Sequence, residues 1–250
     1  MIKPVGKRAL AAFFVSAVSV AGVAWGQGTP APALPAEESD VAVLPAAGPH
    51  RLYQMSSAVG GSDGSVRIIE LEGKALRVVG SVPLNGRATF TLSSDGGKAL
   101  AAETLYSRGN RGDRLDVIAI YDGRTLNLEK EITVPGMLQV VPKSQVFDLS
   151  ADDRLAYVYD MFPASQVYAV DLAAGQVVST VDLPGCALAF PYGARSFATI
   201  CGDGTIGVAT IPAAGGETKA VFSKPFFDPD VDPLFEQSVV DDTTGDGYFL

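Results

Sequence analysis

The chain has 250 residues, of which 47% are hydrophobic and 19% charged, and its formal net charge at pH 7 is −9. This acidic balance disfavours nucleic acid and anionic membranes as partners, because like charges repel. Two cysteines and one histidine are also too few ligands for a structural zinc site.

Residues 1–26 have the features of a secretory signal peptide. Three cations precede a charge-free, mostly apolar run over residues 9–23, and Ala24-Trp25-Gly26 has the small-x-small pattern of a signal-peptidase site. An uncleaved anchor is the alternative, although the run is short for a membrane span. We expect cleavage, export to the periplasm and no membrane insertion of the mature chain.

The segment from residue 27 to residue 49 is rich in proline and alanine, with three acidic side chains between the two richest stretches. Such a composition is typical of an extended, mobile arm rather than a packed segment.

From residue 50 onward, short runs of β-branched and aromatic residues alternate with turns of Gly, Asp and Pro, and helical periodicity is almost absent. The predicted class is all-β. The runs also recur in groups that end in Pro135-Gly136 and Pro184-Gly185. Self-similarity at about fifty residues, with three to four strands in each group, is the pattern of β-propeller blades.

We expect blades over residues 50–84, 85–135, 140–184 and 186–223, and a fifth that begins near Glu236. The sequence stops within a predicted strand of that fifth blade. Residues 50–250 are therefore interpreted as a partial β-propeller of about four and a half blades, truncated at its C-terminal end. A closed four-bladed ring is the alternative, in which the first and last blades would pair.

Cys186 and Cys201 lie in two predicted neighbouring strands that a Pro-Tyr-Gly turn connects. This placement predicts a disulfide, which an exported chain can keep oxidised. A metal site and a buried pair of free thiols are the alternatives.

The sequence offers few groups for catalysis. His50, the only histidine, stands beside Pro49, and no serine lies in the tight glycine-flanked turn of a nucleophile. The acidic stretch from Asp228 to Asp232 lacks the glycine and the terminal glutamate of a calcium loop, so a surface loop is favoured over calcium binding. We expect no catalytic, cofactor-binding or metal-binding residue on this chain.

One cationic cluster interrupts the acidic body, with Arg108, Arg111 and Arg114 followed by Asp116. Ion pairs of Arg114 with Asp116, or of Arg111 with Asp113, would fix a long hairpin. A loop that docks a partner protein is the functional alternative, since propellers carry functional loops on one rim. The Arg-Gly-Asp tripeptide in this cluster is short enough to recur by chance.

Three segments together resemble the heavy, β-propeller subunit of the tryptophan tryptophylquinone amine dehydrogenases. They occur in family order at residues 103–117, 195–204 and 226–235, and the middle segments are nearer to the aromatic amine type than to the methylamine type. In that family the heavy chain is a seven-bladed propeller with an intrachain disulfide, which Cys186 and Cys201 match. The channel-bordering loop of methylamine-type heavy chains has no counterpart at residues 84–90, so no gate residue is assigned.

The resemblance implies an oxidoreductase of two heavy and two light subunits that acts on CH-NH2 donors. It oxidises primary amines to aldehydes and ammonia and passes electrons to a copper protein or a cytochrome. The quinone is built from two tryptophans of the light chain, and this sequence has a single tryptophan, Trp25, inside the predicted signal peptide. The heavy chain would then cradle the light chain and wall part of the amine channel. A non-enzymatic exported propeller for binding or scaffolding is the competing function.

Overall fold

The computed structural model describes residues 42–57, 64–72, 75–137, 143–235, 238–241, 244 and 246–249. The predicted signal peptide and most of the predicted arm lie outside these ranges, as does Glu236. Within them, the structure contains no helix with the length and hydropathy of a membrane span.

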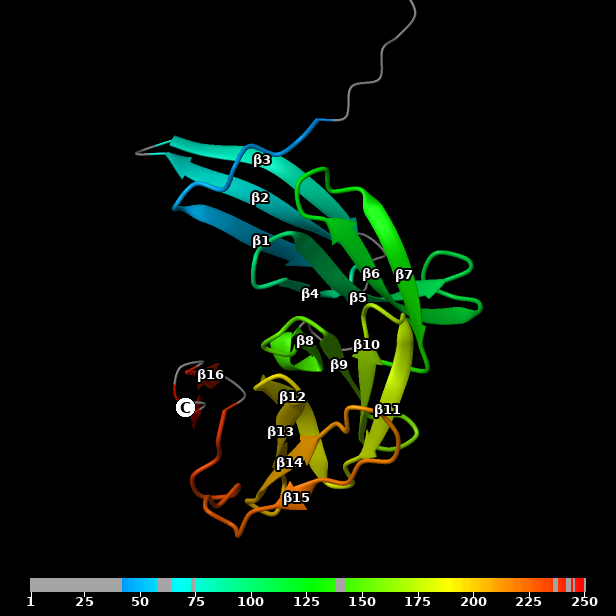
Figure 1. Ribbon diagram of the computed structural model, residues 1–250, viewed down its shortest axis with the longest axis vertical. Helices are drawn as coiled ribbons and strands as arrows, with labels where there is room; N and C mark the ends of the chain where they lie inside the picture. Colours follow the sequence, from blue (N-terminus) through cyan, green and yellow to red (C-terminus); the bar gives the residue numbers. More distant parts are fainter. Residues whose placement is uncertain are drawn as a thin grey trace, which may run out of the picture. The chain divides into compact units, whose positions relative to one another are not determined.

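The chain forms antiparallel sheets in which consecutive strands are neighbours, coloured in turn from blue to red in Figure 1. Sheet A contains β1 (Arg51–Ser57), β2 (Gly64–Glu72) and β3 (Ala75–Leu84). Sheet B contains β4 (Thr89–Leu92), β5 (Lys98–Tyr106), β6 (Arg114–Asp122) and β7 (Leu128–Val134). A short 3-10 helix, η1 (Ser144–Val146), leads into sheet C, which contains β8 (Phe147–Leu149), β9 (Leu155–Asp160), β10 (Gln166–Asp171) and β11 (Gln176–Asp182).

Sheet D contains β12 (Cys186–Tyr192), β13 (Ser196–Cys201), β14 (Ile206–Thr210) and β15 (Val221–Phe222). Sheet E contains β16 (Ser238–Val240) and β17 (Gly247–Phe249). The five sheets fall within the five segments that the sequence assigns to blades.

Neighbouring sheets pack face to face because successive side chains of a strand point to opposite faces. In β9, Ala156 and Val158 join the apolar cluster shared with sheet B, whereas Leu155 and Tyr157 join the cluster shared with sheet D. A third cluster unites sheet A with the other face of sheet B. Sheets B and C are thus apolar on both faces, as a propeller blade between two others must be.

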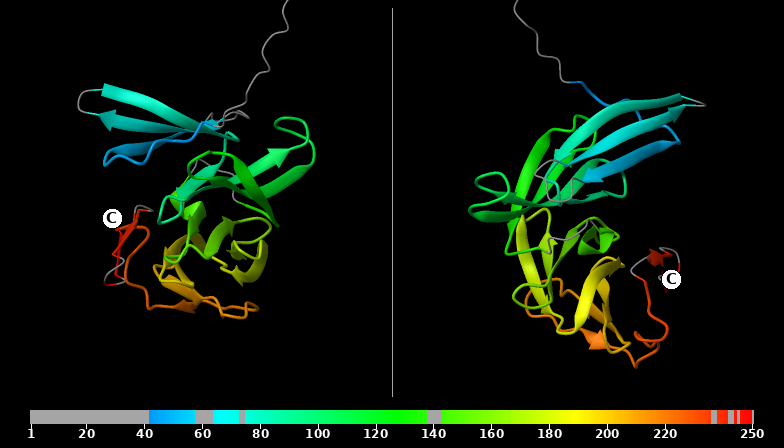
Figure 2. Two further views of the ribbon diagram at one scale, coloured as in Figure 1. Left: turned by 45° about the horizontal axis from the view of Figure 1, so that its top comes forward. Right: turned by 180° about the vertical axis from the view of Figure 1, so that it is seen from behind.

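The first strands of successive sheets also meet: β4 contacts β8, and β8 contacts β12, while β7 contacts β11. The views in Figure 2 show the same succession of sheets from other sides. In a β-propeller, the first strands of successive blades lie next to one another around the central axis. The prediction of an all-β propeller architecture is confirmed, and the seven-bladed ring and the closed four-bladed ring stay predictions.

The turn between the cysteine-bearing strands lies later than the sequence indicates. Pro191 and Tyr192 belong to β12, Pro191 pairs with Phe197, and the chain reverses at Gly193, whose φ is 62°. Proline has no N–H to donate, but β12 is an edge strand of its sheet and tolerates this loss.

The described end of the predicted arm, residues 42–49, lies against the first sheets. Leu44 is 7% exposed, and its N–H donates to the carbonyl of Arg124 at 2.8 Å. The Arg51 guanidinium donates to the carbonyl of Pro45 at 2.8 Å. Packing therefore begins before β1.

Candidate functional site

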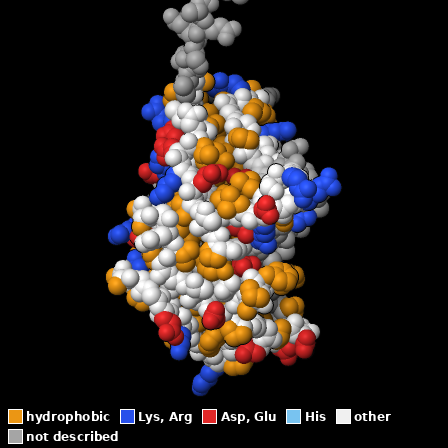
Figure 3. Space-filling model, turned by 90° about the vertical axis from the view of Figure 1, so that its right-hand side faces the viewer, with side chains coloured by type: hydrophobic (Ala, Val, Ile, Leu, Met, Phe, Trp, Pro, Cys, Tyr) orange, Lys and Arg blue, Asp and Glu red, His pale blue; other side chains and the backbone are white. Residues whose placement is uncertain are grey.

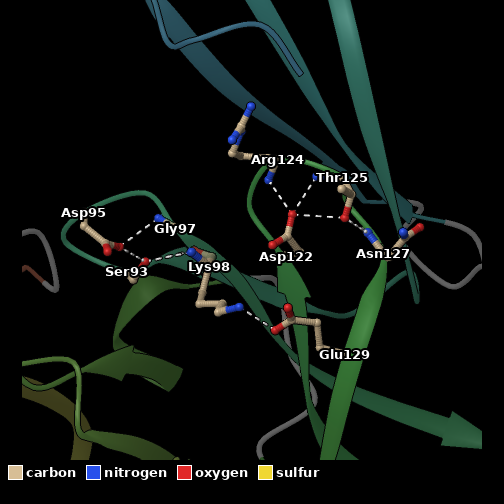
Figure 4. Close-up of polar contacts among 9 residues, drawn as sticks. All are labelled: Ser93, Asp95, Gly97, Lys98, Asp122, Arg124, Thr125, Asn127 and Glu129. Atoms are coloured by element: carbon tan, nitrogen blue, oxygen red, sulfur yellow. Dashed lines mark hydrogen bonds and ion pairs between the residues drawn. The ribbon is translucent and has the colours of Figure 1, made fainter. Parts of the chain in front are cut away.

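The turn between β4 and β5 is held by a serine and an aspartate (Figure 4). The Ser93 hydroxyl and the Gly97 N–H each donate to Asp95 Oδ1 at 2.7 Å, and the Lys98 N–H donates to Ser93 Oγ at 2.9 Å. Lys98 Nζ also pairs with Glu129 of β7 at 2.5 Å. Side-chain hydrogen bonds of this kind close the tight turns that reverse the chain.

The same pattern recurs one blade later, between β8 and β9. The Ser150 hydroxyl donates to Asp152 Oδ1 at 2.7 Å, and the Leu155 N–H donates to Ser150 Oγ at 3.0 Å. The two turns are themselves linked, because the Ser94 N–H and hydroxyl donate to Asp153 Oδ2 at 2.8 and 2.6 Å. The repeat seen in the sequence is thus a repeat of turn chemistry.

Asp95 in the β4–β5 turn and Asp122 at the β6–β7 turn have pKa values below their ordinary value. The Ser93 hydroxyl and the Gly97 N–H lower the pKa of Asp95, whereas the backbone N–H groups of Thr125 and Arg124 lower that of Asp122 (Figure 4). Each carboxylate accepts hydrogen bonds in its charged form, which favours that form.

These shifts predict how stability depends on pH. A carboxylate with a lowered pKa stabilises the folded state above its unfolded pKa of about 3.9, and this stabilisation is lost as the pH falls through the folded pKa. We expect the urea concentration at the unfolding midpoint to decrease as the pH is lowered below about 4. The decrease should be less steep in the variant Asp95→Ala/Asp122→Ala. Asp232→Ala is the control, because the Asp232 side chain accepts no hydrogen bond from the described residues. An equally steep fall in the double variant would contradict this assignment.

A polar cavity of about 330 Å³ opens beside the first strands of sheets B, C and D. Asp148 of β8 and Ser150 lie on one side of it, Phe190 and Tyr192 of β12 on another, and Ser238 of β16 also lines it. Propellers enclose a central channel at this position.

Asp148 is a half-buried carboxyl of this cavity. Thr91 of β4 donates to its Oδ1 at 3.0 Å, which ties two first strands together. Burial raises the pKa of Asp148, and the hydrogen bonds from Leu149 and Thr91 act in the opposite direction. The described lining contains hydroxyl and carboxyl groups but no histidine, so it suits binding of polar groups better than acyl transfer.

Cys186 and Cys201 form a disulfide, with their Cα atoms 3.9 Å apart and a sequence separation of 15. The two residues are cross-strand partners of β12 and β13. Both sulfurs lie in the apolar cluster between sheets C and D, where each cysteine is 4% exposed.

The hairpin of β5 and β6 carries the cationic cluster. Arg114 Nε lies 2.8 Å from Asp116 Oδ2, and the Arg114 guanidinium also donates to the carbonyl of Met137 at 2.6 Å. Thr104 of β5 donates to the same buried Asp116. Arg114 thus holds the turn end of the hairpin against the segment that follows β7.

The tip of the hairpin, residues 107–113, is exposed throughout. Among the described residues, neither Arg108 nor Arg111 has a carboxylate partner, so no Arg111 pair with Asp113 forms. The acidic stretch from Asp228 to Asp232 is an exposed loop, and His50 lies in an exposed turn. No group of three or more His, Cys, Asp or Glu side chains in the described ranges could hold a metal ion.

Sequence reasoning missed the half-buried Asp148 of β8 and the buried Asp160 at the end of β9. The signal for Asp148 was present, because a carboxylate between Phe147 and Leu149 interrupts an apolar strand. The signal for Asp160 was weaker, because Asp160 ends a strand at a turn, where aspartate is common.

The family model and the curated relatives that match this chain name the same protein family. A family model described as methylamine dehydrogenase heavy chain matches residues 53–247. The methylamine dehydrogenase heavy chain of Methylophilus methylotrophus is 26% identical over 180 residues, which are 72% of this chain and 44% of that protein. The corresponding chain of Methylobacillus flagellatus is 28% identical over 140 residues, 56% of this chain and 35% of that protein.

The matched part thus spans less than half the length of these curated relatives. Among solved structures, a Pyrococcus horikoshii acylaminoacyl peptidase aligns with a TM-score of 0.44 and 13% identity, over 70% of this chain and 30% of that one. That likeness is too weak to carry an argument. The family match, by contrast, runs from within β1 to the start of β17 and so includes residues of all five sheets, and the chain therefore belongs to the methylamine dehydrogenase heavy chain family.

Proposed function

We propose that this chain is the heavy, non-cofactor-bearing subunit of a periplasmic amine dehydrogenase. The observation that carries the proposal is the family match over residues 53–247, which begins in the first blade and ends in sheet E. On this proposal the chain cradles a quinone-bearing small subunit and walls part of the amine channel, within an assembly of two heavy and two small subunits. The complex oxidises primary amines to aldehyde and ammonia and passes electrons to a copper protein or a cytochrome.

The residues present do not fit a tryptophan tryptophylquinone on this chain. That group is made from two tryptophans, and the sequence contains one, Trp25, which lies outside the described residues. The proposal therefore assigns the cofactor to the small subunit, where it supplies the oxidising carbonyl chemistry. On this proposal the heavy chain supplies a binding surface. Packed blades, turns held by side-chain hydrogen bonds and the hairpin of β5 and β6 form that surface.

The proposal includes three finer points. The residues at 103–117 and 195–204 favour an aromatic amine substrate, although the curated relatives are methylamine dehydrogenase heavy chains. The signal-like residues 1–26 favour export. The greater length of the relatives favours a complete heavy chain with more blades than the five sheets seen here.

The chain purified alone is expected to show no quinone absorbance and no amine-dependent dye reduction, because it lacks the tryptophans of the cofactor. The measurement is a visible spectrum, followed by a dye assay with phenethylamine and with methylamine. Substrate-dependent dye reduction by the chain alone would refute this division of labour.

A further inference from the structure

A groove with a volume of about 390 Å³ runs between sheets B and C, outside the cavity at the first strands. Its walls come from the start of β6, the end of β7 with Pro135 and Gly136, and the end of β9 with Phe162. We call it the β6–β9 groove. It lies beside the loop that connects β5 and β6, since Arg114, the first residue after that loop, and Asp116 line it.

Apolar side chains stand exposed at the groove. Leu115 is 45% exposed, Met161 is 42% exposed and Phe162 is 69% exposed. Phe162 and Leu115 line the groove directly. Exposed aromatic and methionine side chains beside a hollow are characteristic of protein interfaces, where such side chains become the buried anchors.

The hairpin tip beside the groove carries Arg108 and Arg111 and is closed by hydrogen bonds. The Ser107 N–H donates to the carbonyl of Asp113, and the Arg108 N–H donates to that of Arg111, both at 3.0 Å. The Asp113 N–H donates to Ser107 Oγ at 3.0 Å, and Gly112 has a φ of 99°, which favours glycine. Because these hydrogen bonds restrict the tip, its binding to a partner would cost less conformational entropy than the ordering of an open loop.

The charges indicate what kind of partner fits. Arg108 and Arg111 find no carboxylate among the described residues, on a chain whose net charge is −9. Figure 3 looks onto the right-hand side of Figure 1 and shows basic side chains next to hydrophobic ones on that face. A nucleic acid would be repelled by the acidic body, whereas a local group of carboxylates on a protein would pair with the two guanidinium groups.

We propose that the β6–β9 groove and the hairpin tip dock an acidic surface of the small subunit, with an apolar side chain of that subunit packed against Phe162. This inference rests on the proposed function, which names the partner. It adds the place of contact and the chemistry of the contacting surface.

The test measures binding of the co-expressed, purified small subunit to the full chain by surface plasmon resonance at two salt concentrations. The variant Arg108→Glu/Arg111→Glu is expected to bind about tenfold more weakly and to lose most of the salt dependence, because rim charges act mainly on the association rate. Phe162→Ala is expected to bind about tenfold more weakly, through faster dissociation.

Lys219→Glu/Lys224→Glu is the matched control. It changes the net charge equally at two exposed lysines that do not line the groove, and it is expected to bind like the wild type. Thermal unfolding of each variant checks that the fold is retained. Wild-type binding by both groove variants would overturn the docking surface and leave the proposed function standing. Absence of binding by the wild type would overturn the proposed function and the inference with it.

Discussion

Replacing Phe197 by alanine is expected to lower the free energy of unfolding by about 3–5 kcal/mol, the cost of removing a large buried aromatic side chain. Phe197 of β13 is 0% exposed. Its ring centroid lies 5.1 Å from that of Tyr157 in β9, so the pair joins sheets C and D. The alanine would leave a cavity between two blades that cannot collapse without moving whole sheets. Urea unfolding followed by circular dichroism measures the change.

Tyr157→Phe is the matched control at the same contact. The Tyr157 hydroxyl is buried and has no hydrogen-bond partner among the described residues. Removing it keeps the ring contact and removes an unsatisfied polar group, so stability should be unchanged or higher by about 1 kcal/mol. A loss for Tyr157→Phe as large as that for Phe197→Ala would show that ring packing between the blades is not what stabilises them.

The double variant Cys186→Ala/Cys201→Ala is expected to unfold with a free energy lower by about 2–5 kcal/mol. The disulfide closes a loop with a sequence separation of 15, which removes about 3 kcal/mol of entropy from the unfolded chain. The two sulfurs also fill space in the apolar cluster between sheets C and D. Equilibrium denaturation of the two proteins side by side measures the difference.

Reduction of the wild type gives the control, because it opens the bond without removing the sulfurs. Reduced wild type should lie close to the double variant in stability, and slightly above it. Peptide mapping without a reductant should recover Cys186 and Cys201 in one linked peptide pair. Recovery of both as alkylated free thiols would contradict the disulfide.

The architecture could be predicted because its causes are local. Alternating apolar residues specify strands, and the turns from Ser93 to Lys98 and from Ser150 to Leu155 repeat the same hydrogen bonds in two successive blades. Two cysteines on consecutive strands of one hairpin are brought together by short-range pairing alone. Such features need no knowledge of how one blade meets the next.

The surfaces between blades could not be predicted in the same way. The β6–β9 groove unites Arg114 with Phe162, and the inner cavity unites Asp148 with Tyr192 and Ser238. These neighbours come from different sheets, so their proximity depends on blade packing rather than on any sequence spacing. The position of Pro191 in a strand could not be predicted for the same reason. Proline is tolerated there because β12 is an edge strand, and the edge position is known only from the order of strands in the sheet.

The most direct test of the heavy-subunit assignment is amine-dependent dye reduction by the chain co-expressed with a tryptophan-bearing small subunit encoded in the same genome. The account predicts that the two chains co-purify, and that the complex reduces the dye in the presence of a primary amine while neither chain does so alone. A higher kcat/KM for phenethylamine than for methylamine would support the aromatic amine assignment. Failure of the two chains to associate, or a complex that no primary amine can reduce, would contradict the account and favour a propeller that only binds.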